Sequence, residues 1–137
     1  SVMRIHEQFS LTSSYHSNTD LLSHDDWGRV QQATAAWYNL ISNTCHKDHD
    51  CHFSVSIRFS YDGRYTIRIA HDGEIATAWE ERHDSVATAM RRLLRRICTQ
   101  ALQECEPCED DDMEIRTRRN QTRKILDTLM LSLSRST

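Results

Sequence analysis

Residues 53–79 alternate between apolar and polar side chains, and this run constrains the fold more than any other part of the sequence. Apolar residues occupy odd-numbered positions in three segments, and mostly polar residues lie between them. A period of two is typical of half-buried β-strands. Asp-Gly pairs at 62–63 and 72–73 separate the segments and indicate tight turns. The run predicts a three-strand antiparallel meander with one apolar face.

The loop length follows from the odd-numbered apolar pattern. A two-residue loop would pair odd with even positions and put neighbouring apolar rows on opposite faces. A three-residue loop with glycine in the left-handed conformation at its third position pairs odd with odd. Tyr61-Asp62-Gly63 and His71-Asp72-Gly73 both match this loop. The predicted cross-strand rows are Phe59–Tyr65–Trp79, Ile57–Ile67–Thr77 and Val55–Ile69–Ile75.

Helical patterns flank the meander. Ser23, with an acid three residues on, opens a capping-box pattern for a helix that runs to about Ser42. Asp84 or Ser85 caps a second helix that ends near Glu104. A third covers residues 110–135, and apolar residues between Ile5 and Leu11 leave open a fourth, N-terminal strand. The fold prediction is α+β, a single domain over 3–137 in the order (β)-α-β-β-β-α-α, with the meander packed on one face against two or three helices.

Composition limits the kinds of partner. The chain has 137 residues and a formal net charge of −3, so bulk attraction to nucleic acid or anionic membrane is not implied. No apolar run has the roughly 18 residues that a membrane-spanning helix requires. The N-terminus does not resemble a signal peptide, and Met3 after Ser1-Val2 is the expected natural start. We therefore expect a cytoplasmic protein.

The predicted element order over roughly residues 5–104 resembles that of double-stranded-RNA-binding domains. With the N-terminal strand, it also resembles that of the small ribosome-hibernation factors. The resemblance concerns topology and hairpin pattern, since the second helix does not begin with a Lys-Lys or Lys-x-x-Ala-Lys signature. It implies a module that binds RNA or DNA, as an alternative function, and carries no residue assignment with it.

Arginines are the candidate contacts for an anionic ligand or a partner. Those of the meander lie at even positions, opposite the apolar rows, and four more lie on the second helix. The candidates are Arg58, Arg64, Arg68, Arg91, Arg92, Arg95 and Arg96. The alternative is a solvated polar face whose charge Glu74 and Glu80 balance.

Cysteine and histidine suggest a metal site. Cys105-Glu106-Pro107-Cys108 has the Cys-x-x-Cys spacing with which two thiolates reach one tetrahedral Zn²⁺. The segment 45–52 is a second region dense in ligands. The candidate ligands are Cys45, Cys51, Cys105, Cys108 and His49. The alternative is surface thiols beside a solvated histidine-rich loop, with no cofactor.

The last helix is dense in leucine and methionine, and its apolar face must be covered by its own domain or by a partner. We expect a homodimer or higher oligomer, because three helices exceed what a three-strand sheet covers. The expected contacts are Ile125, Leu126, Leu129, Met130 and Leu133.

No phosphate-binding glycine loop, nucleophile elbow or His-Glu-x-x-His motif occurs in the sequence. The leading functional prediction is a small intracellular non-enzymatic binding protein. It would regulate or inhibit a macromolecular partner by occupying that partner's surface, and we expect the partner to be a protein rather than a nucleic acid. A nucleic-acid-binding module and a zinc-stabilised interaction domain are the alternatives.

Overall fold

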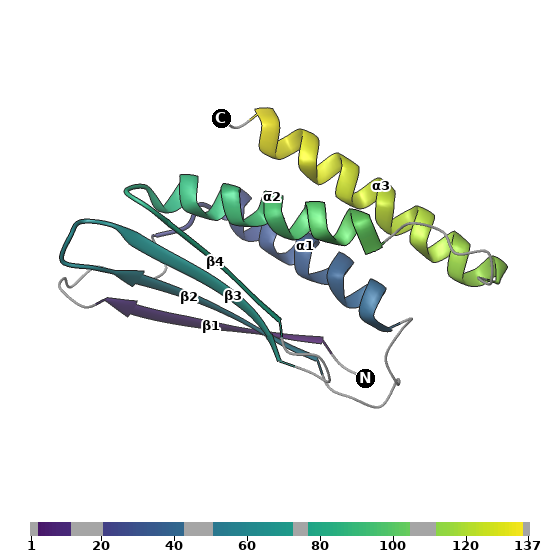
Figure 1. Ribbon diagram of the computed structural model, residues 1–137, viewed down its shortest axis with the longest axis horizontal. Helices are drawn as coiled ribbons and strands as arrows, with labels where there is room; N and C mark the ends of the chain where they lie inside the picture. The colour runs from purple at the N-terminus through teal and green to yellow at the C-terminus, as the bar shows by residue number, and fades with distance from the viewer. Residues whose placement is uncertain (1–2, 12–20, 43–50, 73–76, 105–111, 136–137) are drawn as a thin grey trace.

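Four strands form one sheet with the spatial order β1-β2-β3-β4 (Figure 1). The structure, a computed structural model, describes residues 3–11, 21–42, 51–72, 77–104 and 112–135, with the backbone alone described for 3–11, 41–42, 51–52 and 72. The strands are β1 (Met3–Leu11), β2 (Cys51–Phe59), β3 (Tyr65–Asp72) and β4 (Thr77–His83). Strands β2 to β4 are antiparallel, which confirms the meander, and β1 pairs with β2 in parallel. A parallel pair requires a crossover connection, and helix α1 provides it.

The first hairpin has the predicted three-residue loop. Phe59 pairs with Tyr65, and the Ser60 amide donates to the Arg64 carbonyl at 2.9 Å. Gly63 has a φ of +82°, a conformation that costs glycine little because it has no Cβ. The Asp62 carboxylate accepts the Arg64 amide at 3.1 Å and holds the turn.

The predicted register of the second hairpin is wrong by four residues. Trp79 pairs with Ile69 rather than with Tyr65, and Tyr65 pairs with His83. The three-residue loop was expected to start at His71, but His71 belongs to β3 and is buried. A shift by four, an even number, keeps Trp79 on the predicted face, because faces alternate with a period of two. The predicted row member Ile75 lies outside the described residues.

Side-chain caps begin the three helices near the predicted positions. Helix α1 (His24–Ser42) has Ser23 as its cap, whose hydroxyl accepts the Asp26 amide at 3.1 Å. Ser85 does the same for α2 (Val86–Glu104), where the Thr88 amide donates at 3.3 Å. The Asp112 carboxylate caps α3 (Met113–Arg135) and accepts the Ile115 amide at 2.8 Å.

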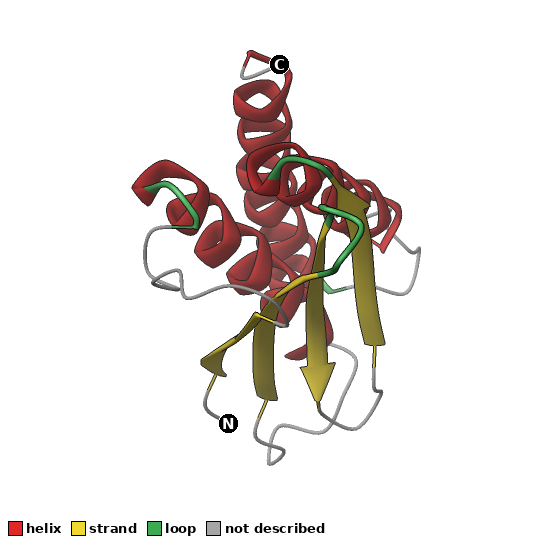
Figure 2. Ribbon diagram, turned by 90° about the vertical axis from the view of Figure 1, so that its left-hand side faces the viewer, coloured by secondary structure: helices red, strands yellow, loops and turns green. Residues whose placement is uncertain are grey.

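The helices form two layers above one face of the sheet (Figure 2). Helices α1 and α2 cover the sheet, and α3 lies on α1 and α2 (Figure 1). We expected that a three-strand sheet could not cover three helices, because we assumed that all three would pack directly on the sheet. Instead α3 packs on helices, and Leu126, Leu129 and Leu133 are buried there within the chain.

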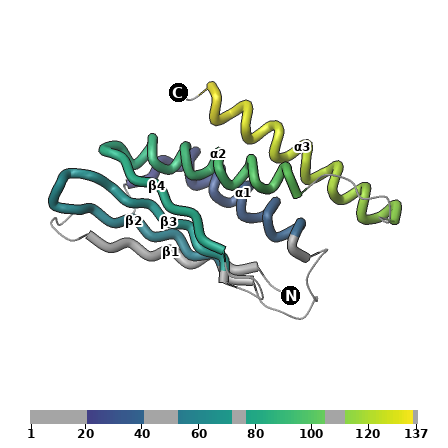
Figure 3. The backbone as a smooth tube through the Cα atoms, in the orientation of Figure 1, coloured from purple at the N-terminus to yellow at the C-terminus, as the bar shows by residue number. Residues whose placement is uncertain are grey.

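The main core lies between the sheet and the first helix layer. The odd-numbered strand residues meet apolar residues of both helices, and Trp37 of α1 packs edge-to-face on Trp79 with 5.0 Å between ring centroids. Gln100 accepts the Trp79 indole N–H at 2.9 Å. After β4 the chain enters α2, and this helix runs back across the sheet (Figure 3). No helix in the described ranges is long and apolar enough to cross a membrane.

Candidate binding surfaces

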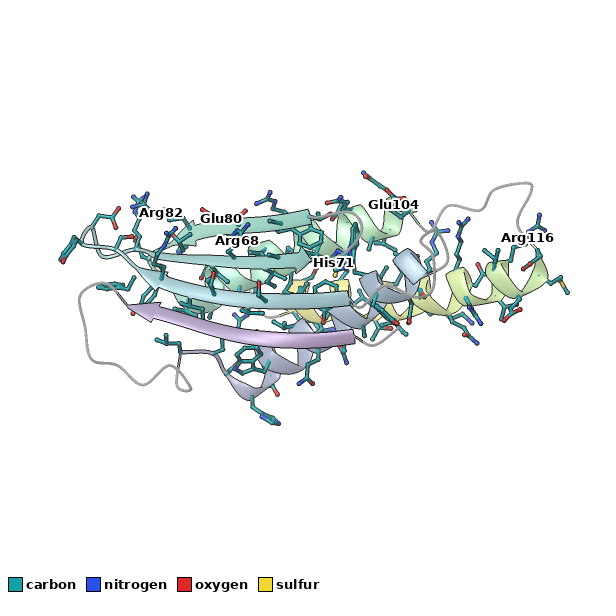
Figure 4. The ribbon with its side chains drawn as sticks, turned by 90° about the horizontal axis from the view of Figure 1, so that it is seen from below. Arg68, His71, Glu80, Arg82, Glu104 and Arg116 are labelled. Atoms are coloured by element: carbon teal, nitrogen blue, oxygen red, sulfur yellow. The ribbon has the colours of Figure 1, made fainter. Side chains whose placement is uncertain are left out.

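The sheet face opposite the helices is open, and even-numbered side chains form it (Figure 4). We call the described part of this surface the open face. Small residues make up much of it, and four charged side chains stand among them: Arg58, Arg68, Glu80 and Arg82. The other members are Ser54, Ser56, Thr66, Ala70 and Ala78.

Two cross-strand rows carry the charges of the open face. One row runs Arg58–Thr66–Arg82, and Thr66 is only 7% exposed although no helix covers it. Its place between two long arginine side chains accounts for this burial. The next row contains Arg68 directly opposite Glu80. The open face is therefore basic near the first hairpin and mixed in charge toward its middle.

Ion pairs hold the end of the sheet at the first hairpin. Arg82 pairs with Asp62 of the turn, and Arg64 lies 3.5 Å from Asp84, just before α2. All four side chains are exposed, so each pair contributes at most about 1 kcal/mol. Their effect is to orient Arg64 and Arg82. Arg82 was not among the predicted site residues because the meander was expected to end at residue 79, but the same even-position pattern continues to it.

The four arginines of α2 do not share the open face, because α2 lies on the other side of the sheet. Arg96 donates to the Glu80 carbonyl at 2.6 Å and to the Glu81 carboxylate at 3.1 Å. Arg95 donates to the Leu133 carbonyl of α3 at 2.9 Å. Arg92 is exposed, and the described part of the chain offers it no partner.

Arg91 belongs to a polar junction between the three helices. Its Nε lies 3.6 Å from the Asp26 carboxylate, which also pairs with Arg29 at 2.7 Å. The Arg29 guanidinium donates in turn to the Ser132 hydroxyl of α3 at 3.0 Å. Asp26 is 1% exposed, so its two arginines offset the loss of water around the carboxylate. Sequence reasoning identified Asp26 only as the acid of a capping box. The 3.6-residue spacing of apolar residues does not show which polar positions of a helix will contact another helix.

Most predicted metal ligands lie outside the described residues. Cys45, His49, Cys105 and Cys108 are in undescribed segments, and for Cys51 only the backbone in β2 is described. The described side chains contain no cluster of three or more His, Cys, Asp or Glu that could hold a metal. Zinc binding therefore stays a prediction. Cys98 is buried in α2, and burial raises the pKa of its thiol to about 12, so it is protonated at neutral pH.

The predicted self-association residues divide between core and surface. Ile125 is 44% exposed and Met130 partly buried, whereas the three leucines of the set are in the core. Leu131, which was not in the set, is 59% exposed. Oligomer formation stays a prediction, and of the predicted set Ile125 and Met130 have exposed surface to contribute.

No family model matches the sequence, and no curated protein matches it. The fold is similar to the N-terminal domain of Protein Y from Thermus thermophilus, at 13% identity and a TM-score of 0.44. It is also similar to a ribosomal subunit interface protein from Coxiella burnetii, at 10% identity and a TM-score of 0.36. Each alignment covers 72% of this chain and 94% of the other. Similarity at this level assigns no function to this chain.

Proposed function

We propose that this protein is a non-enzymatic binding protein whose open face docks on an acidic surface of a protein partner and thereby regulates or inhibits that partner. The observation that carries the proposal is the uncovered sheet face, on which exposed Arg58, Arg68 and Arg82 stand among small side chains. Each guanidinium can form paired hydrogen bonds with a carboxylate. Arginine is also one of the residue types that most often dominate the energy of protein interfaces.

The strands prepare this surface for binding. Antiparallel pairing fixes the spacing of the arginine-bearing rows, and the ion pair with Asp62 restricts Arg82 before a partner arrives. Side chains on a paired sheet lose less conformational freedom on binding than side chains on a loop. The open face can therefore bind without reorganising the fold.

The charge pattern favours protein over nucleic acid as the partner of the open face. Glu80 is exposed beside Arg68, near the middle of the surface, and would repel a phosphate backbone. The described side chains of the open face include no aromatic ring on which a base could stack. A protein surface can satisfy both signs, with carboxylates for the arginines and a cation for Glu80.

The test compares two variants with equal changes in charge. R58Q/R64Q/R68Q removes three cations from the open face and its hairpin end, and R116Q/R123Q/K124Q removes three from α3. Tagged wild-type and variant chains are used to capture partners from nuclease-treated host extract, with quantitative mass spectrometry. We expect recovery of the main partner to fall at least about tenfold with the first variant and to persist with the second. Equal recovery by the first variant and the wild type would rule out the open face as the docking surface.

A further inference from the structure

The N-terminal half of α3, residues 113–124, is strongly basic. It carries five cations and one carboxylate, for a net charge of +4 in a protein whose net charge is −3. The cations are Arg116, Arg118, Arg119, Arg123 and Lys124, and all except the partly buried Arg119 are exposed. We call these five side chains the α3 basic cluster.

The α3 basic cluster is not needed to pack the helix. Buried side chains of α3 begin only at Thr122 and continue as Leu126, Leu129 and Leu133. The first turns of the helix extend past the ends of α1 and α2 (Figure 1). Arg116 lies near the tip of this extension, at the opposite end of the molecule from Arg82 of the open face (Figure 4). The fold therefore presents the cluster on a projecting helix, apart from the open face.

The positions of these cations are unfavourable for the isolated helix. Arg116 lies near the positive end of the helix dipole, where acids and not bases are stabilising. Arg116, Arg119 and Arg123 follow at spacings of three and four, so like charges are neighbours on one side. The Glu114 carboxylate pairs with Arg118 at 2.7 Å and offsets one of the charges. An external anion would add favourable interactions with the cations on this side.

We propose that the α3 basic cluster binds the phosphate backbone of double-stranded nucleic acid. Arg118 and Lys124 lie to either side of the line formed by the other three arginines, so the helix offers cations to phosphates in more than one direction. Asn120 and Gln121 between them are exposed and add hydrogen-bond donors. Glu114 is the one acid within 113–124, and the acidic run 109–112 precedes it, so negative charge lies at one end of the cluster, unlike Glu80 within the open face. No aromatic residue occurs in 113–124, so backbone contact with a duplex fits better than base stacking with a single strand.

The test measures fluorescence anisotropy of a labelled mixed-sequence duplex of about 20 base pairs, as DNA and as RNA, with the full chain. We expect binding to both duplexes, because the phosphates are common to them, and a steep loss of affinity between roughly 50 and 200 mM salt. R116Q/R123Q/K124Q should weaken binding at least about tenfold at low salt. It should also reduce the slope of log K against log salt concentration by about 2 to 3, since each lost phosphate contact removes about 0.9.

The charge-matched control is R58Q/R64Q/R68Q, which should bind within about twofold of the wild type. Circular dichroism and a thermal melt establish that both variants are folded. Equal losses with both variants would show an effect of net charge alone and would overturn the proposal. So would an unchanged affinity of the α3 variant, or wild-type binding of labelled polyglutamate as tightly as of either duplex, because the surface would then not select phosphates.

Discussion

The two halves of α3 differ in nearly every physical respect, although they form one continuous helix. The C-terminal half buries Leu126, Leu129 and Leu133 against α1 and α2, and it accepts hydrogen bonds from both helices. The N-terminal half buries only Thr122, at its inner end, and carries the α3 basic cluster. The C-terminal half holds the helix in place, and the N-terminal half is left available for other molecules.

The same contrast separates the arginines of α2 and α3. Arg91 and Arg95 of α2 are committed to Asp26 and to the Leu133 carbonyl, so they join helices within the chain. The α3 arginines project beyond the core. An arginine-rich helix is therefore not by itself a binding surface, because its position relative to neighbouring helices decides whether its charges are used internally.

The largest expected effect tests the burial difference within α3. Leu129→Ala should lower the free energy of unfolding by about 3 kcal/mol, because a fully buried leucine leaves a cavity. Ile115→Ala, on the same side of the helix but only partly buried, should cost less than about 1 kcal/mol. Urea denaturation followed by circular dichroism measures both. Equal costs would show that the N-terminal half is docked as firmly as the C-terminal half.

Sequence reasoning predicted the local features well. The caps at Ser23 and Ser85, the left-handed Gly63 and the rows Phe59–Tyr65, Ile57–Ile67 and Val55–Ile69 all agree with the structure. Each depends on interactions between residues close in the chain, or on a loop whose length follows from one glycine. Such features are determined by a few neighbouring residues, so the sequence is enough to predict them.

Features that depend on distant parts of the chain were not predictable. The second hairpin kept the predicted face but not the register, because alternation gives the same pattern after a shift by any even number of residues, here four. Periodicity also placed the α2 arginines opposite the core without showing that α3 would cover Arg95. It identified the apolar face of α3, but not that α1 and α2 bury it rather than a second chain.

A smaller effect is expected at the junction that links all three helices. Asp26→Asn should lower the free energy of unfolding by about 2 kcal/mol. It leaves Arg29 and Arg91, which are 15% and 27% exposed, without their shared counter-charge. The control is Asp25→Asn, an exposed neighbour in the same helical turn, which should change stability by no more than about 0.5 kcal/mol. Hydrogen exchange should then be faster in the C-terminal half of α3, which Arg29 contacts, and nearly unchanged at its N-terminal end. Faster exchange along the whole helix would mean that the two halves open together.

The smallest effect isolates one bond between α2 and the C-terminal half of α3. Arg95→Gln removes the guanidinium that donates to the Leu133 carbonyl, and we expect a loss of about 1 kcal/mol. Arg92→Gln is the matched control, because Arg92 is an exposed arginine of the same helix and its loss should cost no more than about 0.5 kcal/mol. Both variants remove one charge from α2, so they affect any long-range electrostatic binding about equally. If duplex binding is unchanged in both while only Arg95→Gln is destabilised, Arg95 acts in folding and neither α2 arginine takes part in duplex binding. A weaker duplex affinity in either variant would extend the basic surface from α3 to α2.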